Sequence, residues 1–182
     1  MGLDMYLSKK TYVKNWEHQS PEHQHQITVL KGGEPRKDIK PERINYIVEE
    51  VAYWRKFNAL HAWFVGECAD GVDDCREVYV GTEKINELLD ILKQVKEKLD
   101  TGKLIKKTEK GWNGEDYEVE VYDNADEIEE LLSPQSGFFF GSTNIDEYYK
   151  QDVEDTIKVF ETLLKEDEET GSHGDYYYQA SW

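Results

Sequence analysis

The sequence predicts an α+β fold with a mixed, largely antiparallel sheet, three longer helices and one short helix. Two observations predict this class. Stretches with alternating apolar residues, typical of strands, are interspersed with stretches of helical periodicity. These stretches do not follow the strict strand–helix–strand rhythm of a parallel sheet. The length of 182 residues, 38% of them apolar, favours a single domain over residues 1–182 with one core.

The first 66 residues predict two strands and one long helix. Residues 2–7 alternate apolar and polar side chains, which is typical of a half-buried strand, and residues 26–31 fit a second strand. Polar loops separate these strands from each other and from the helix. We expect the helix to begin near Pro41, because proline suits the first helical turn, and to end at about Gly66. Its apolar faces would come from Ile44, Ile47, Val48, Val51, Trp54, Leu60 and Phe64.

Residues 78–122 predict a strand, a helix and a β-hairpin. Val78–Val80 is a short strand, and Thr82 is expected to cap an amphipathic helix that ends at Gly102. Beyond Gly102 the apolar period changes to two. Strands at 104–109 and 117–122 would then flank residues 111–114, whose Asn-Gly pair favours the positive φ of a tight turn.

The last 60 residues predict two helices and two strands. Asn124 and Glu127 have the spacing of a capping box, so a short helix should begin there and end at Ser133-Pro134. Residues 137–141 predict an aromatic strand, and residues 176–181 predict the final one. Between them lies a long helix to about Glu166, capped by one of three residues. The candidates for this cap are Ser142, Thr143 and Asn144.

The charge of the chain is strongly asymmetric. Residues 1–110 hold 19 basic and 19 acidic residues, whereas residues 111–182 hold 3 and 20, so the whole net charge of −17 lies in the last part of the chain. Direct binding to nucleic acid or to an anionic membrane requires clustered Lys and Arg, and the net charge argues against both. The composition therefore favours a basic partner.

The absence of long apolar stretches argues against a transmembrane protein, because a membrane-spanning helix needs about 20 apolar residues. The first residues lack the apolar region of a signal peptide, so a cytoplasmic location is expected. Cys68 and Cys75 are then expected to be thiols, although one loop disulfide between them stays open.

The candidate partner-binding surface is the acidic stretch on the predicted hairpin and short helix. No Lys or Arg occurs from Gly111 to Tyr149, so we expect nothing local to compensate these acids, which a basic partner would relieve. A solvated edge that only prevents aggregation is the alternative. Neighbouring aromatic residues would supply buried anchors. The candidate residues are Glu115, Asp116, Glu118, Glu120, Asp123, Asp126, Glu127, Glu129 and Glu130, with Trp112, Tyr117 and Tyr122 as anchors.

A second candidate site lies on the predicted long helix. Trp54, Asn58 and His61 would share one helical face, with Arg55 one turn away from Asn58. They would either line a pocket for a nucleotide or another small anion, or serve as satisfied core groups that orient the helix. Residues 137–143 lead from strand to helix but match no phosphate-binding loop, so capping is the better interpretation. No catalytic serine motif surrounds Ser136 or Ser142.

No cofactor or metal site is expected. His18, His23 and His25 match none of the zinc-binding spacings, and a solvated loop explains them better. Residues 68–75 place three acids between two cysteines without the alternating acids of a calcium loop. We therefore interpret this segment as the turn that ends a helix.

Several segments resemble a family of phage- and prophage-borne proteins that includes a type II-A anti-CRISPR, an inhibitor of the RNA-guided CRISPR nuclease. These segments are residues 1–7, 53–65, 70–75, 136–142 and 181–182, which span nearly the whole chain. The resemblance implies binding to the guide-RNA-loaded type II nuclease and interference with its DNA binding or cleavage, without catalysis. It assigns no residue roles. The acidic surface is compatible with DNA mimicry, because such a nuclease grips nucleic acid in a positively charged channel.

Overall fold

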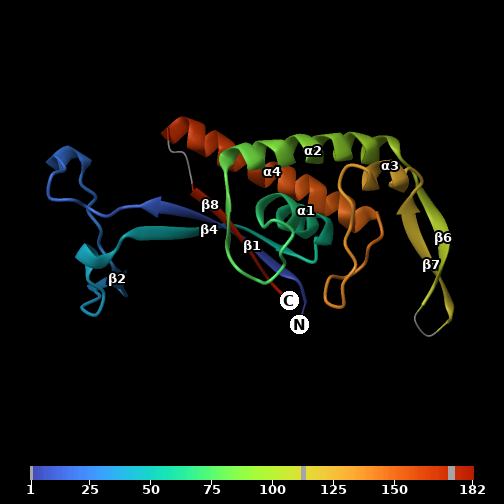
Figure 1. The fold of residues 1–182 in the computed structure, drawn as a ribbon, viewed down its shortest axis with the longest axis horizontal. Coiled ribbons are helices and arrows are strands. Elements are labelled where there is room, and N and C mark those ends of the chain that lie inside the picture. The colour runs from blue at the N-terminus through green and yellow to red at the C-terminus, as the bar shows by residue number, and fades with distance from the viewer. Residues whose placement is uncertain (1, 112–113, 172–174) are drawn as a thin grey trace.

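The computed structural model describes residues 2–111, 114–171 and 175–182, and it has the α+β fold that the sequence predicts. Its main sheet is antiparallel throughout the described strands, in the order β4 (Tyr46–Arg55), β1 (Asp4–Tyr12), β8 (Asp175–Ser181) and β5 (Val78–Val80). β1 and β8 therefore pair with each other in the middle of the sheet, and the two ends of the described chain lie near each other (Figure 1).

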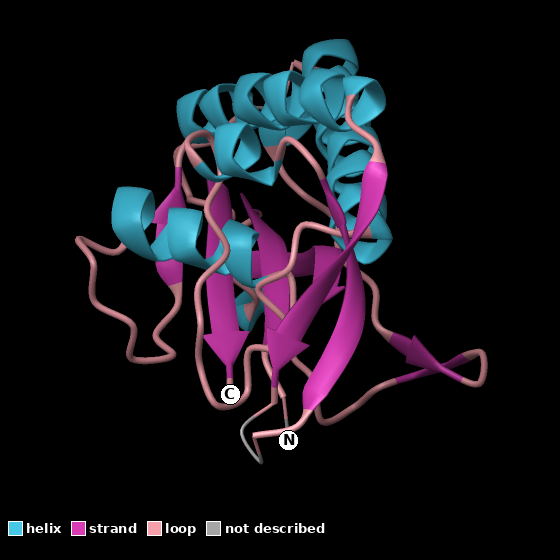
Figure 2. Ribbon diagram, turned by 90° about the vertical axis from the view of Figure 1, so that its right-hand side faces the viewer, coloured by secondary structure: helices cyan, strands magenta, loops and turns pink. Residues whose placement is uncertain are grey.

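The described residues form four helices, α1 (Asn58–Cys68), α2 (Thr82–Thr101), α3 (Ala125–Glu129) and α4 (Glu147–Thr170), which gather on one side of the sheet (Figure 2). The sheet face toward them is apolar. Trp54 of β4 packs edge-on against Phe160 of α4, with ring centroids 6.1 Å apart, and Phe64 of α1 stacks on Tyr178 of β8 at 4.2 Å. One hydrophobic core thus joins sheet and helices. None of the described helices is long and apolar enough to cross a membrane.

The opposite face of the sheet carries tyrosines. Tyr6 and Tyr53 lie 5.3 Å apart, and Tyr79 and Tyr177 lie 5.8 Å apart. Tyr53 and Tyr79 are exposed. This row follows from the strand period of two, because the neighbours of the buried residues in each strand point outward.

Two ribbons project at opposite ends of the molecule (Figure 1). At one end β1 and β4 extend beyond the helices and carry the small hairpin of β2 (Leu30–Lys31) and β3 (Glu34–Pro35), with 3-10 turns at Pro21–His23 and Pro41–Arg43. At the other end β6 (Leu104–Lys110) pairs with β7 (Asp116–Tyr122) as a separate antiparallel hairpin. The predicted hairpin, the short strand at 78–80, the helix before Gly102 and the final strand are therefore confirmed.

The predicted helix from Pro41 to Gly66 is wrong. Residues Tyr46–Arg55 form strand β4, and the helix begins only at Asn58. The apolar spacing of this stretch fits a helix, but its β-branched and aromatic residues favour a strand that pairs with β1. The first half of β4 is exposed, so no alternation between buried and solvated residues marked it as a strand.

Five smaller expectations also differ. The strand expected at 26–31 is limited to Leu30–Lys31, and residues 138–140 form a turn in which Phe140 N–H donates to Gly137 O at 3.1 Å. Thr82 is the first residue of α2, after an N-cap at Gly81. Asp146 caps α4, because its carboxylate accepts from the N–H groups of Tyr148 and Tyr149, both at 3.0 Å, and this helix continues to Thr170. Asn124 precedes α3 without a side-chain cap.

Candidate functional site

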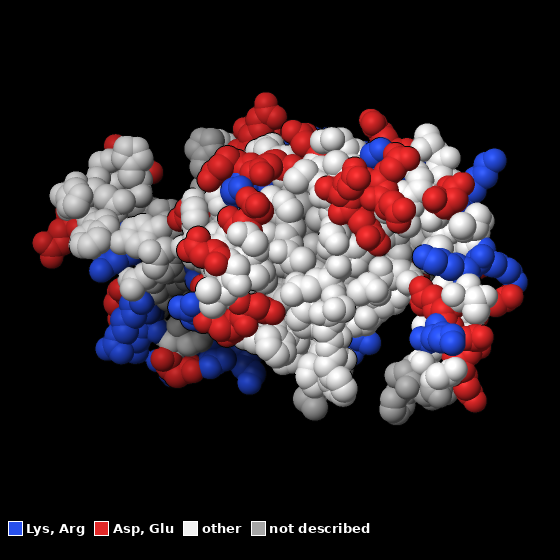
Figure 3. Space-filling view, turned by 45° about the vertical axis from the view of Figure 1, so that its right-hand side comes forward, with Lys and Arg blue, Asp and Glu red and all other residues white. Residues whose placement is uncertain are grey.

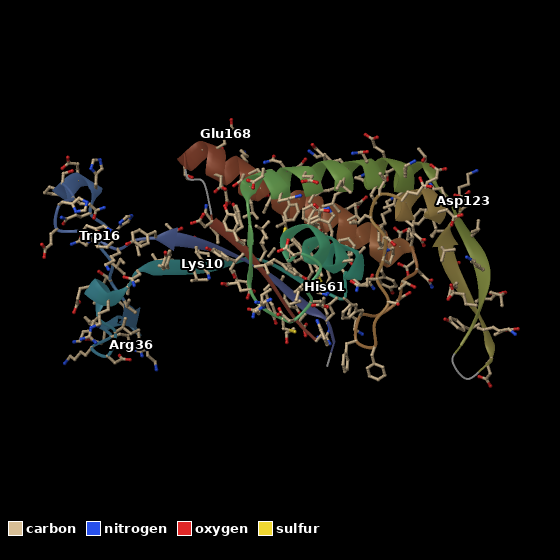
Figure 4. All side chains as sticks on the ribbon, viewed as in Figure 1. Lys10, Trp16, Arg36, His61, Asp123 and Glu168 are labelled. Carbon is tan, nitrogen blue, oxygen red and sulfur yellow. The ribbon has the colours of Figure 1, made fainter. Side chains whose placement is uncertain are left out.

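All nine predicted acidic residues are exposed and belong to one end of the molecule, formed by β7, the residues beside it and α3. Strand pairing fixes the hairpin acids at alternate positions, and a turn at residues 123–124 leads from β7 into α3. Figure 3 shows acidic side chains in dense groups over the helices and mixed with basic ones on the hairpin. Asp123 lies where β7 meets α3 (Figure 4).

The expectation that nothing local compensates these acids is wrong for part of the hairpin and for Glu127 of α3. Lys106 of β6 pairs with Glu118 at 3.0 Å, and Lys98 of α2 pairs with Glu127 at 2.6 Å. Lys110 lies opposite Asp116 in the strand register. The compensating lysines precede Gly111 in the chain, so they were missed because strand pairing, not sequence neighbourhood, brings them close.

The remaining acids of α3 form what we call the α3 acidic patch: Asp126, Glu129 and Glu130. In the described part of the chain, none of the three forms an ion pair or a side-chain hydrogen bond. Three like charges within two helical turns repel each other, and this repulsion is relieved when a positive surface binds. The α3 acidic patch is therefore the part of the predicted surface where binding of a positively charged partner relieves the most repulsion.

The predicted aromatic anchors are only partly available. Tyr117 is exposed, and its hydroxyl donates to Glu109 at 3.1 Å. Tyr122 is only 5% exposed, and its hydroxyl donates to Glu147 at 2.9 Å, so the structure removes it as a surface anchor. Trp112 lies outside the described residues.

Sequence reasoning missed a cleft of about 230 Å³ between the hairpin and the start of α4. Tyr148 in this cleft is 82% exposed. An exposed aromatic ring among carboxylates suits a basic side chain, through an ion pair and a cation–π contact. The prediction placed Tyr148 inside a helix, where nothing in the sequence marked it as the neighbour of β6. The cleft is lined by Leu104, Glu120, Asp146, Glu147 and Tyr148.

The second candidate site divides into two separate environments. His61 is fully buried, with Nδ1 2.7 Å from the Tyr178 hydroxyl and Nε2 3.0 Å from Asp73 Oδ2 (Figure 4). Buried Asn58 donates to Phe140 O at 3.1 Å and Ser142 O at 2.7 Å. It also accepts from Gln135 N–H at 3.2 Å. Both side chains are therefore satisfied core groups, the second of the two interpretations that the sequence left open.

Arg55 lies apart from His61, on an open cleft of about 290 Å³ between the end of β4 and the start of α4. It is largely exposed and lies 3.7 Å from Asp4. We call this the Lys56 cleft; its lining residues are Arg55, Lys56, Phe57, Asn58, Gly141, Ser142, Asn144, Asp146, Tyr148, Tyr149, Gln151 and Asp152. Part of the predicted pocket thus exists, but the imidazole of His61, the expected acid or base, does not line it.

Asp152 is the perturbed acid of this cleft. Burial, with Asp155 and Asp146 nearby, raises the pKa of Asp152 from 3.8 to about 6. The folded protein therefore holds this proton more tightly than the unfolded chain does. Asp152 destabilises the folded state progressively as the pH rises from about 4 to about 6, and fully above that.

We expect Asp152→Asn to raise the free energy of unfolding by about 1 kcal/mol at about pH 7.5, with almost no change at about pH 4, after allowing for solvent screening. Urea denaturation at the two pH values measures this. Asp155→Asn on the same helix is the control and should not stabilise, because a hydrogen bond from Lys158 lowers the pKa of Asp155. A destabilised Asp152→Asn protein at about pH 7.5 would contradict the prediction.

The described cysteines and histidines are not clustered with other possible metal ligands. No group of three or more His, Cys, Asp or Glu side chains among the described residues is arranged to hold a metal ion. His18, His23 and His25 are exposed in the β1–β4 projection, and His23 Nδ1 lies 2.9 Å from Ser20 Oγ. Cys68 and Cys75 are both free, so the open question of a loop disulfide is answered for this structure.

Burial raises the pKa of the Cys68 thiol to about 11. Since the thiolate is the reactive form, Cys68 should react with iodoacetamide roughly 100-fold more slowly than free cysteine at about pH 7.5. Mass spectrometry of the modified peptides at successive times measures this rate, with the urea-unfolded protein as control. Modification of Cys68 in the folded protein at the rate of free cysteine would contradict the raised pKa of its thiol.

Fold and surface together define an α+β protein with a polarised charge, an unpaired acidic patch at one end and an open aromatic sheet face. No family model, curated protein or solved structure matches the chain.

Proposed function

We propose that the protein is a phage-derived, stoichiometric inhibitor that binds the guide-RNA-loaded nuclease of a type II CRISPR system in the bacterial cytoplasm. It blocks the binding or cleavage of target DNA and catalyses no reaction itself. The acidic end of the molecule supports a basic partner, and the resemblance of the sequence segments to the phage family is the reason for proposing this particular one.

The observation that supports the proposal best is the α3 acidic patch. Its three carboxylates are exposed and unpaired in the described structure, although lysines pair with Glu127 of the same helix and with Glu118 of the neighbouring hairpin. A nuclease of this class holds nucleic acid in a positively charged channel. DNA presents one charge per roughly 1.7 Å of its axis, and a carboxylate-bearing helix and ribbon compete for the same cationic groups.

The cleft around Tyr148 gives the interface an anchor that charge alone does not supply. Binding energy at interfaces is concentrated in a few buried aromatic or arginine contacts surrounded by a polar rim. Tyr148 is exposed between Glu120 and Glu147, so an arginine of the partner that enters this cleft meets both a ring and carboxylates.

Target-DNA binding by a guide-loaded type II nuclease, measured with and without this protein at a low and a high salt concentration, tests the proposal. We expect loss of DNA binding that weakens as the salt concentration rises, because the acidic surface is screened. Inhibition that is insensitive to salt would indicate that the aromatic sheet face, and not the acidic surface, is the interface. Unchanged DNA binding and cleavage across a panel of such nucleases would refute the proposed function.

A further inference from the structure

The Lys56 cleft shares no residue with the α3 acidic patch, but Asp146 and Tyr148 line both it and the cleft around Tyr148. Its volume of about 290 Å³ is just below the range for small-molecule sites, roughly 300–1,000 Å³. Two walls form it. The end of β4 and the start of α1 supply basic groups, and the first turns of α4 supply acidic ones.

Lys56 is held in an unusual conformation on the basic wall. Its φ of 63° is left-handed, which costs a residue with a side chain roughly 1–2 kcal/mol. Its N–H donates to Leu3 O at 2.8 Å, and its own carbonyl accepts from Asn58 N–H at 2.8 Å. Strained backbone of this kind persists where the surrounding structure fixes it, and it is frequent at binding sites.

Two glycines make room for the Lys56 side chain. A Cβ atom at Gly2 would lie 3.3 Å from Lys56 Cε, and one at Gly141 would lie 3.2 Å from Lys56 Cδ. The aliphatic stem therefore runs between two residues that have no side chain, which limits where the ammonium group can go. Lys56 is exposed and lines the cleft, so its cation is available to a ligand there.

Lys56 and Asp152 line the same cleft without neutralising each other. In the described part of the chain, neither side chain forms an ion pair or hydrogen bond. A half-buried carboxylate without a partner is unfavourable, and an ammonium group bound beside it relieves that cost. Arg55 adds a second cation on the basic wall, and Asp146 adds a carboxylate that already caps α4.

We propose that the Lys56 cleft binds a small zwitterion of the free amino acid class, with its carboxylate at Lys56 and Arg55 and its ammonium group at Asp152. A phosphate-bearing ligand fits less well. The first N–H groups of α4 already donate to Asp146, and the two carboxylates of the cleft repel a multiply charged anion. This inference goes beyond the inhibitor function and does not depend on it.

The test uses the free proteinogenic amino acids, added one at a time to the full chain and observed by ligand-detected NMR. At least one should bind, and its N-acetyl amide, which lacks both charges, should bind at least tenfold more weakly, because Lys56, Arg55 and the partly buried Asp152 then lose their charged partners. Lys56→Met and Asp152→Asn should each weaken binding by about tenfold or more. Lys107→Met and Glu168→Gln, which change exposed residues elsewhere, are the matched controls.

Lys56→Gly separates the role of the side chain from that of the backbone. Glycine adopts the positive φ without strain, so this variant keeps the fold while removing the cation, and we expect it to lose binding as Lys56→Met does. The proposal is overturned if no amino acid binds, if acetate or inorganic phosphate binds as tightly, or if Lys56→Gly and Asp152→Asn bind like the unmodified protein. Nuclease inhibition should be unchanged in Lys56→Gly and Asp152→Asn. Failure of the proposed inhibitor function is therefore distinguishable from failure of the amino-acid-binding proposal.

Discussion

Reversing the charge of the α3 acidic patch with Asp126→Lys, Glu129→Lys and Glu130→Lys is expected to abolish inhibition and to weaken binding to the guide-loaded nuclease by about 100-fold or more. The substitution replaces attraction by repulsion at three exposed positions that have no partner of their own in the described structure. Immobilising the nuclease and recording association and dissociation measures the change. We expect most of the loss in the association rate, since charge steers the encounter.

A variant of equal charge change at the far end of α4 is the control. Glu166, Glu168 and Glu169 are exposed, and Figure 4 shows Glu168 at the opposite end of the helical layer from Asp123. Their replacement by lysine should leave most of the binding intact, because repulsion falls off within about 8–10 Å at ordinary ionic strength. Equal loss in both triple variants would show that net charge matters and not the α3 acidic patch. Circular dichroism establishes that each variant is folded.

Asn58→Ala is expected to lower the free energy of unfolding by about 2–4 kcal/mol. The buried amide satisfies three backbone groups of the segment between α3 and α4: Gln135 N–H and the carbonyls of Phe140 and Ser142. Alanine leaves these groups without their partner in the interior, which costs more than the hydrogen bonds themselves are worth. Urea denaturation followed by tryptophan fluorescence measures the difference.

Asn86→Ala is the matched substitution on the surface. The Asn86 side chain is exposed and only donates to Thr82 O within α2, so we expect a change of at most about 0.5 kcal/mol. A loss below about 1 kcal/mol for Asn58→Ala would mean that the segment after α3 is held by other contacts, such as Tyr149, whose hydroxyl donates to Leu132 O at 2.8 Å.

The sequence predicts those elements whose periodicity and turn chemistry agree. The stripe of leucines before Gly102 and the two paired strands on either side of residues 111–114 are of this kind, and both form as predicted, while Asn113 of the predicted turn lies outside the described residues. β4 was missed because its outer half is exposed on both faces and therefore has no pattern, while pairing with β1 decides its conformation. Non-local pairing overrides local propensity in strands more than in helices.

Of the candidate site, only the acidic composition could be predicted from the sequence. Exposure of the acids at 115–130 follows from their charge, and the structure places all nine at the surface. Which of them remain unpaired depends on lysines in β6 and α2. The burial of Tyr122 and the exposure of Tyr148 depend on where the hairpin meets α4, which no local pattern encodes.

The pairing of β1 with β8 has a consequence for how the protein is made. As the chain leaves the ribosome, β1 can pair with β4, but its other edge stays open until β8 has emerged. An unpaired central edge exposes backbone N–H and C=O groups to other nascent chains, which is a route to aggregation. The last strand of the sheet to be synthesised is therefore the one that closes this edge.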